Sequence, residues 1–165
     1  MKLYINKLTL ILFIVTIFTS CDDKGYDKFE NKKTDTAEMN GEWYIDIIDE
    51  ASGDVLVQHT KHITYDSNMG DGKMFINDFQ NGYYLGGLVN TDTKNLTFST
   101  TDEENFQDPG STFNITEGKI LKGMARSKNG TVVDSIYFKG EFSYDPGTII
   151  IFAGHKRTGF LEDEY

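Results

Sequence analysis

The feature that most constrains this chain is the regular alternation of β-forming runs and turn signals from Gly41 to the C-terminus. No stretch in this part has an apolar period of 3.6 residues over a helical length. Asn81-Gly82, Asn129-Gly130 and Asp145-Pro146-Gly147 supply the backbone angles that tight turns need. The pattern predicts an all-β, antiparallel meander. Its expected strands are 42–49, 55–65, 73–79, 83–90, 96–100, 112–116, 119–126, 131–144 and 148–157.

A meander of about eight or nine strands leaves two unpaired edges unless the sheet closes on itself. Closure into an up-and-down β-barrel removes both edges, so we expect this fold for residues 41–165. A chain of this length buries a sizeable core, and the single cysteine excludes an intrachain disulfide. At about eight strands, a barrel interior holds either side chains or one small ligand.

The N-terminus has a different character. Lys2 and Lys7 precede an apolar run at 8–18, and Thr19-Ser20 leads directly to Cys21. This arrangement resembles a bacterial lipoprotein signal peptide, and the run is shorter than the roughly 20 residues of a membrane helix. We therefore expect residues 1–20 to be removed and Cys21 to carry lipid that holds the protein to a membrane. An ordinary secretory signal with an incidental cysteine is the alternative.

Residues 21–40 are polar and charged, and they predict a flexible tether between the lipidated cysteine and the barrel. The acidic pair Asp22-Asp23 resembles the export signals of outer membrane lipoproteins in the phylum Bacteroidota. It leaves open whether the protein faces the cell surface or the periplasm. Asp35-Thr36-Ala37 and Asp134-Ser135-Ile136 resemble O-glycosylation sites of that phylum.

The chain is acidic, with a formal net charge of −10 at pH 7. Removal of residues 1–20 takes away two lysines and leaves 14 basic against 26 acidic residues, a charge of about −12. Such a surface repels phosphate groups, which argues against nucleic-acid binding and against electrostatic docking on anionic lipid.

Gly41-Glu42-Trp43, at the start of the first expected strand, looks like the Gly-x-Trp signature of lipocalins. Together with the lipoprotein signal and the segments 140–148 and 154–164, it resembles the Bacteroidota family of lipid-binding putative hydrolases, over roughly 41–165. The resemblance implies a lipocalin-like lipoprotein, with a barrel of the lipocalin or calycin type and a lipid as ligand. By analogy with lipocalins, Trp43 closes the barrel floor and Arg157 packs across its indole, a favourable cation–π pair.

Strand parity gives the expected ligand-binding wall. If Trp43 points inward, then Ile45 and Ile47 on the same strand also point inward. In each of the other strands, we take the more apolar of the two alternating sets of residues to face the interior. The expected inward residues are Ile45, Ile47, Val55, Val57, Leu96, Phe98, Phe138, Phe142, Ile149 and Ile151, of which Ile45, Val57, Phe98, Phe138, Phe142 and Ile151 are the principal ligand contacts. Such a lining suits a lipid, a fatty acid or another apolar small molecule. The same side chains could instead fill the interior completely.

The sequence contains few candidate catalytic or metal-binding residues. His59, His62 and His155 are the only imidazole bases, no Gly-x-Ser-x-Gly motif exists, and period-two alternation puts His59 and His62 on opposite faces of one strand. We therefore nominate no catalytic residue. We nominate no metal ligand and no cofactor either, because the histidines lack ligand spacing and the acidic loop 66–72 breaks the calcium-loop pattern.

Two other functions remain open. The family name allows a lipid or ester hydrolase, which would need a serine or aspartate hydrogen-bonded to a histidine in a cleft. A β-sandwich surface protein could bind glycans or another envelope protein through exposed aromatic residues such as Tyr83, Tyr84 and Phe106. That fold would show two unclosed sheets.

Overall fold

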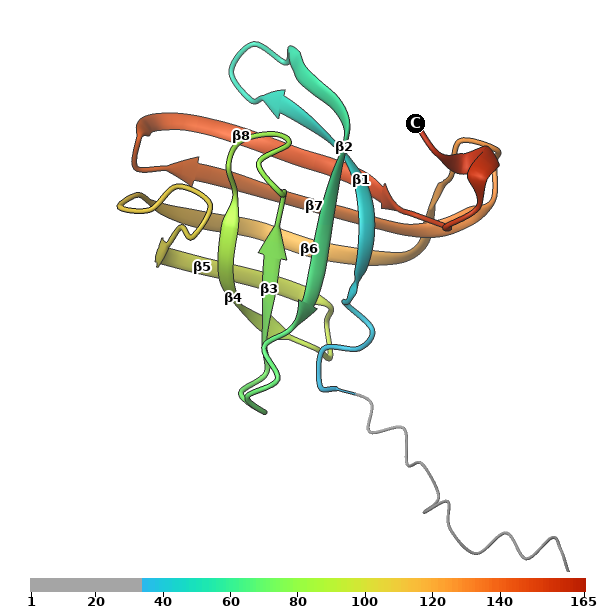
Figure 1. Ribbon diagram of the computed structural model, residues 1–165, viewed down its shortest axis with the longest axis horizontal. Coiled ribbons are helices and arrows are strands. Elements are labelled where there is room, and N and C mark those ends of the chain that lie inside the picture. The colour runs from blue at the N-terminus through green and yellow to red at the C-terminus, as the bar shows by residue number, and fades with distance from the viewer. Residues whose placement is uncertain (1–33) are drawn as a thin grey trace, which may run out of the picture. The chain divides into compact units, whose positions relative to one another are not determined.

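The computed structural model describes residues 34–165, which form a closed antiparallel barrel of eight strands in sequence order (Figure 1). Pairing of the first strand with the last, from Trp43 opposite Lys156 to Asp49 opposite Ile150, closes the cylinder. The expected fold class is confirmed. The strands are β1 (Gly41–Asp49), β2 (Val55–Asp66), β3 (Lys73–Asn77), β4 (Gly86–Asp92), β5 (Thr97–Glu104), β6 (Thr112–Arg126), β7 (Val132–Phe142) and β8 (Asp145–Lys156), followed by the short 3-10 helix η1 (Leu161–Asp163).

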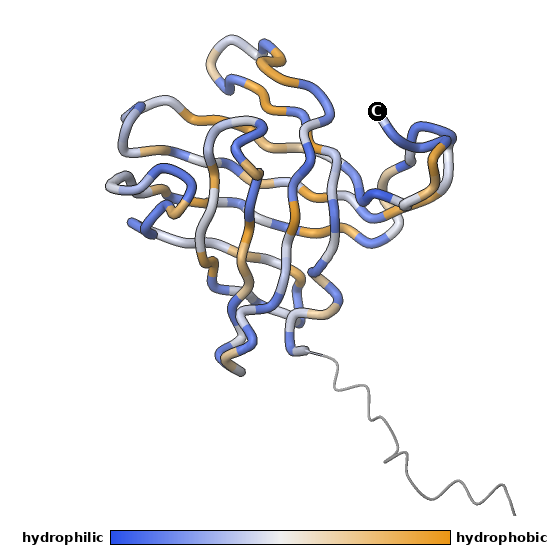
Figure 2. Tube along the Cα trace, in the orientation of Figure 1, coloured by the Kyte–Doolittle hydropathy of each residue, from blue (hydrophilic) through white to orange (hydrophobic). Residues whose placement is uncertain are grey.

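The barrel is flattened into two layers. Strands β1–β4 stand upright on the near side of Figure 1, and β5–β8 run across behind them. The two halves therefore cross at a steep angle, as in orthogonal sheet packing. Apolar residues recur along the strands while the connecting loops are mostly hydrophilic (Figure 2), so the core lies between the layers.

Two expected turns are in fact irregularities within strands. Glu117-Gly118 interrupts the β6–β7 register between Thr116 and Lys119, with Glu117 at a φ of 54°, and the chain continues as one long strand. A Cβ on Gly118 would lie 2.3 Å from the carbonyl oxygen of Phe98, so this close approach requires glycine. The expected break between 116 and 119 was therefore wrong, because the turn-like pair forms a bulge.

The expected turn at Asp145-Pro146-Gly147 is displaced in the same way. The β7–β8 hairpin turns at Ser143 and Tyr144, and Phe142 pairs with Asp145 before the register shifts. Gly147 has a φ of 86° and lies inside β8. Proline and the left-handed glycine mark an irregular strand start here, which sequence alone does not separate from a turn.

The segment 34–40, directly before β1, contacts the barrel. Met39 is completely buried in the core, and the buried Thr36 hydroxyl donates to Asp66 Oδ2 at 2.8 Å. Met39 and Thr36 therefore hold this segment against the barrel. In this conformation the Thr36 hydroxyl is not accessible to a glycosylating enzyme.

Signal residues 1–20, Cys21 and most of the expected tether lie outside the described residues. Within residues 34–165, no helix is long and apolar enough to cross a membrane.

Candidate ligand-binding site

Trp43 is buried in the core cluster of the barrel interior. Its side chain is 1% exposed, and its indole N–H donates to Thr64 Oγ1 at 2.9 Å. The Thr64 hydroxyl in turn donates to the backbone carbonyl of Met39 at 2.7 Å. These two hydrogen bonds give the buried indole N–H an acceptor and hold the segment before β1 against the barrel.

The cation over the indole is Lys156, whose Nζ lies 5.7 Å from the Trp43 ring. The expected cation was Arg157, which instead forms ion pairs with Glu42 and Glu164. Lys156 is the register partner of Trp43, so the two residues are neighbours across the β1–β8 seam. The assignment of Arg157 to this role was wrong by one position, because the sequence does not fix the register of the seam.

Most of the expected lining does lie inside. Ile45, Ile47, Phe98, Phe138 and Phe142 are buried in one core cluster, with Leu96 packed against it. The structure adds residues that parity assigned incorrectly or did not assign. These are Met74, Ile76, Leu85, Val89, Phe113, Ile115, Ile120, Ile136, Ile150 and Phe152.

Val57 was expected inside and is 38% exposed, and Val55 is also exposed. Register shifts occur on both sides of Ile47, where Ile45 pairs with Thr60 but Ile47 pairs with Val57. These irregularities reset the inward–outward alternation of β2, so parity counted from one end fails at the other.

Ile149 and Ile151 were also placed on the wrong face. Ile150 and Phe152 are fully buried while Ile149 and Ile151 are half-buried, and Phe152 lies opposite the inward Ile47. Residues 149–152 form a continuous apolar run, so hydropathy offers no alternation from which to choose a face. Pairing with β1 decides it.

Aromatic rings occupy one side of the interior. Phe138 and Phe152 stack in parallel with centroids 4.5 Å apart, and Phe98 and Phe142 pack against this pair at 5.7 and 6.4 Å. A Cβ at Gly140 would lie 3.0 Å from the Phe152 ring. Side chains therefore fill this part of the barrel.

Polar groups enter the same interior from β2 and the end of β3. His62, on β2, is 1% exposed, and its ring meets Phe152 edge-on at 5.9 Å. Asp78, directly after β3, is fully buried, and its Oδ1 accepts from the backbone N–H of Gln80. Burial lowers the pKa of His62 to about 4 and raises the pKa of Asp78, although backbone N–H groups oppose the latter shift.

A pocket of about 200 Å³ lies beside these groups and is lined by Glu42, Lys61, His62, Phe79, Asn81 and Arg157. The β2–β3 ladder begins at Ile63 opposite Asn77. Beyond it, β2 continues next to the β3–β4 loop without that ladder, and the pocket lies at this gap in the barrel wall. A second pocket, of about 610 Å³, is lined by polar residues of β4–β6 and by Phe98.

The last residues of the chain cover the outer wall near the 200 Å³ pocket. Glu164 accepts hydrogen bonds from Arg157, Lys61 and the Tyr44 hydroxyl, and these hold the Glu164 pKa well below its ordinary value. The Tyr165 ring stacks on His59 at 3.8 Å. Two residues of the pocket, Lys61 and Arg157, are thereby held by the C-terminal segment.

The histidines do not form a nucleophile–base–acid chain in residues 34–165. His59 pairs with Asp46 at the surface, and His155 contacts the Tyr165 hydroxyl. His62 Nδ1 lies 3.3 Å from Thr60 Oγ1, but that hydroxyl donates to the carbonyl of Ile45. No serine hydroxyl in the described residues is hydrogen-bonded to an imidazole.

Acidic loops have structural partners. In the loop 66–72, Asp71 accepts from the Ser67 hydroxyl at 2.6 Å, and Asp66 accepts from the backbone N–H of Asn68. Within residues 34–165 no group of three or more acidic, histidine or cysteine side chains could hold a metal ion.

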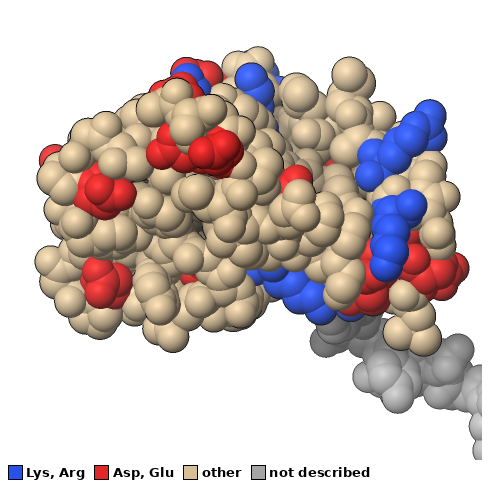
Figure 3. Space-filling model, turned by 90° about the horizontal axis from the view of Figure 1, so that it is seen from above, with Lys and Arg blue, Asp and Glu red and all other residues tan. Residues whose placement is uncertain are grey.

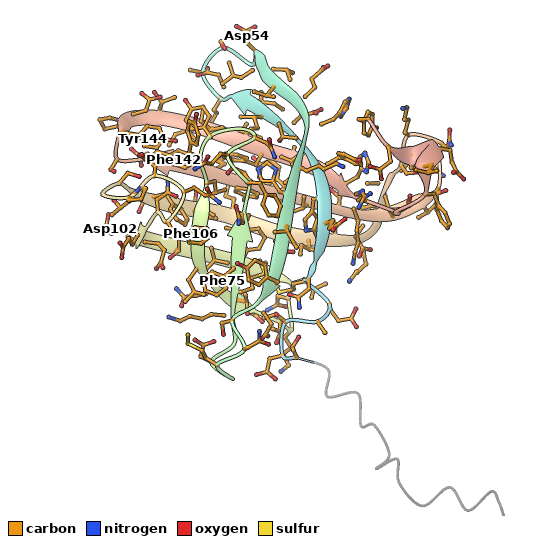
Figure 4. The ribbon with its side chains drawn as sticks, in the orientation of Figure 1. Asp54, Phe75, Asp102, Phe106, Phe142 and Tyr144 are labelled. Atoms are coloured by element: carbon orange, nitrogen blue, oxygen red, sulfur yellow. The ribbon has the colours of Figure 1, made fainter. Side chains whose placement is uncertain are left out.

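The aromatic residues expected at the surface separate into two environments. Tyr83 packs on Phe142 and donates its hydroxyl to Asp145, whereas Tyr84 and Phe106 are exposed. Phe106 continues an outer row with Phe75 and Tyr65, whose neighbouring ring centroids lie 6.2 and 5.1 Å apart (Figure 4). The expected alternative of two unclosed sheets is wrong, because the sheet closes.

Charged groups are dispersed around the barrel end shown in Figure 3. Acidic side chains there are separated by uncharged areas, and several Lys and Arg side chains lie toward the side that carries the C-terminus. The view shows no broad basic surface of the kind that binds a phosphate backbone.

A closed eight-stranded antiparallel barrel with an apolar interior defines the class of lipocalin-like β-barrel proteins. A family model described as lipid-binding putative hydrolase matches residues 28–161, so the chain belongs to the lipid-binding putative hydrolase family. A search of curated proteins found no match.

Proposed function

We propose that this protein binds a small apolar ligand, a lipid or fatty acid, inside its barrel while its own N-terminus is anchored in the cell envelope. The observation that carries the proposal is the closed barrel itself, whose interior is apolar and includes Trp43. Membership of a lipid-binding family supports the same ligand class. Burial of apolar surface would supply the affinity, at roughly 25 cal/mol per Å².

The gap between β2 and the β3–β4 loop is the proposed entrance. It has a pocket at the surface, and two buried polar side chains lie behind it. The aromatic stack of Phe138 and Phe152 fills the interior beyond, so a ligand chain would enter along the β2 side and displace or reorder the side chains that face it.

Trp43 offers a direct assay because it is the only tryptophan. We expect titration with a fluorescent long-chain fatty acid to quench Trp43 emission by energy transfer with saturable, one-to-one stoichiometry. Unlabelled fatty acid should reverse the quenching. A linear, unsaturable response would contradict a site inside the barrel.

For the anchor, we propose that Cys21 is acylated and that the mature chain resides in the outer membrane, on the cell-surface or periplasmic side. The short apolar run ending at Cys21 supports this assignment. In the native host, a Cys21→Ala variant should lose incorporation of labelled fatty acid and leave the membrane fraction. Retention of both would refute the anchor without affecting the barrel assignment.

A second candidate function is supported by the outer aromatic row Tyr65, Phe75 and Phe106. Tyr65 and Phe106 are exposed at the two ends of this row, and exposed aromatic rings can stack on sugar rings or receive an envelope protein. Phe106→Ala should weaken binding to a surface polysaccharide in affinity electrophoresis and leave fatty-acid titration unchanged.

A further inference from the structure

Two buried polar atoms stand out in the part of the barrel that the proposed entrance reaches. Among buried side-chain nitrogen and oxygen atoms of residues 34–165, His62 Nε2 and Asp78 Oδ2 have no hydrogen-bond partner. Both side chains are at most 1% exposed. An unpaired polar group at such depth is costly, so a pair of them requires a partner that the chain itself does not supply.

The two groups come from neighbouring positions. Ile63 lies opposite Asn77 in the last pair of the β2–β3 ladder, so His62 and Asp78 are the residues directly beyond that pair on the two sides. Gly82 packs against both Ile47 and this carboxylate, since a Cβ there would lie 2.3 Å from Ile47 Cδ1 and 3.5 Å from Asp78 Oδ2.

Hydrogen-bond chemistry identifies what the imidazole presents. His62 Nδ1 lies 3.3 Å from both oxygens of Thr60, and the Thr60 hydroxyl already donates to the carbonyl of Ile45. Nδ1 therefore faces acceptors and carries the proton of the neutral ring, which leaves Nε2 as an acceptor. Burial, which lowers the pKa of His62 to about 4, keeps the ring neutral at pH 7.

Asp78 presents a second acceptor. Its Oδ1 is occupied by the Gln80 N–H, and Oδ2 is free. No lysine or arginine within residues 34–165 forms an ion pair with it. A ligand that satisfies both sites must donate at least two hydrogen bonds, and a positive charge on it would also offset the buried carboxylate.

We propose that His62 and Asp78 anchor the primary ammonium head group of a long-chain amine whose apolar chain lies in the barrel. A primary ammonium has three N–H donors on one compact charge, enough for Nε2 and Oδ2 together. The 200 Å³ pocket, lined in part by His62 and Phe79, provides the route from the surface. This inference rests on the proposed function, because it specifies the ligand of the same interior.

The test compares ligands with one chain and different heads. The purified full-length chain is titrated at pH 7 with dodecylamine, 1-dodecanol, dodecanoate and dodecyltrimethylammonium, below their micellar concentrations. Binding is followed by Trp43 fluorescence and by calorimetry; Trp43 lies opposite His62 in the β1–β2 register. We expect dodecylamine to bind at least tenfold more tightly than each of the others. Dodecyltrimethylammonium has the charge without N–H donors, so it separates hydrogen bonding from attraction to an acidic protein.

Two variants test whether Asp78 itself causes the preference for the amine. Asp78→Asn should abolish the preference for the amine, lowering its affinity about tenfold while the affinity for dodecanol stays within a factor of three. Asp54→Asn removes the same charge from the exposed β1–β2 turn (Figure 4) and should leave the preference intact. Circular dichroism checks that each variant folds. If Asp78→Asn does not fold, the wild-type comparison of amine with trimethylammonium decides alone.

The outcomes separate the two proposals. If all four compounds bind without preference for the amine, the proposed role of His62 and Asp78 in binding an ammonium group is overturned. Water would then be the partner of the two acceptor atoms, and the proposed binding of lipid in the barrel would be unaffected. Tighter binding of dodecanoate would also overturn the ammonium site. Failure of every compound to bind would overturn both the ammonium site at His62 and Asp78 and the proposed binding of an apolar ligand in the barrel.

Discussion

The indole N–H of Trp43 donates to the hydroxyl of Thr64, 21 residues away and on the neighbouring strand. This buried bond joins β1 to β2, and the same hydroxyl holds the backbone of Met39. A single side chain thus satisfies two groups that have no access to water.

Thr64→Val preserves shape but removes the hydroxyl. We expect a loss of about 1–3 kcal/mol in the free energy of unfolding, because the indole N–H and the Met39 carbonyl both become unpartnered. Urea denaturation followed by Trp43 fluorescence measures the loss. Thr64→Ser retains the hydroxyl and is the matched control; equal destabilisation by Val and Ser would show that the bond is unimportant.

Lys156 and Arg157 make a second pair of matched variants. Lys156→Met removes the cation 5.7 Å from the indole and should shift the Trp43 emission maximum and reduce stability by about 0.5–1 kcal/mol. Arg157→Met should leave the emission maximum unchanged, since Arg157 pairs with Glu42 and Glu164 instead. The opposite pattern of emission shifts would restore Arg157 as the cation over the indole.

Barrel closure depends on the glycine at the β1–β8 seam. A Cβ at Gly154 would lie 2.0 Å from the backbone oxygen of Tyr44 and 2.8 Å from Ile45 Cα, so Gly154→Ala should cost roughly 3 kcal/mol or more by forcing the strands apart. Gly41→Ala is the control at the same seam, because its Cβ would meet the flexible end of Lys156. Thermal unfolding of the two variants should differ clearly; similar melting temperatures would argue against a tight seam.

Buried His62 predicts a specific pH dependence. The unfolded chain binds a proton at this residue below pH 6.5, whereas the folded protein resists protonation until about pH 4. Stability should therefore fall between pH 6.5 and 4, by on the order of 3 kcal/mol from this group. His62→Leu should flatten the slope in this window. An unchanged slope in His62→Leu would mean that the imidazole is hydrated in the folded state.

Sequence patterns predicted the fold well because closure follows from strand number and hairpin connections. They failed where a turn signal lies within a strand, as at Gly118 and Gly147. Bulges and hairpin turns require the same backbone conformations, so composition cannot distinguish them. Long-range pairing alone decided between the two.

The interior was predictable where strands alternate cleanly, as in Ile45 and Ile47. It was not predictable in the continuous run 149–152, nor in β2, where irregular pairing with β1 resets the faces. The placement of His62 and Asp78 directly beyond the last β2–β3 pair depends on the register of these strands, which no local pattern encodes. Polar residues at inward parity are the one signal that could have directed attention to them.

The central claim is that the barrel holds a lipid. Native mass spectrometry of the protein purified from its own cells, without added lipid, tests this most directly. We predict a population heavier than the covalent protein by the mass of one small apolar molecule, which is lost when the same sample is denatured. A spectrum with the covalent mass alone, unchanged after incubation with a lipid extract from those cells, would contradict the claim.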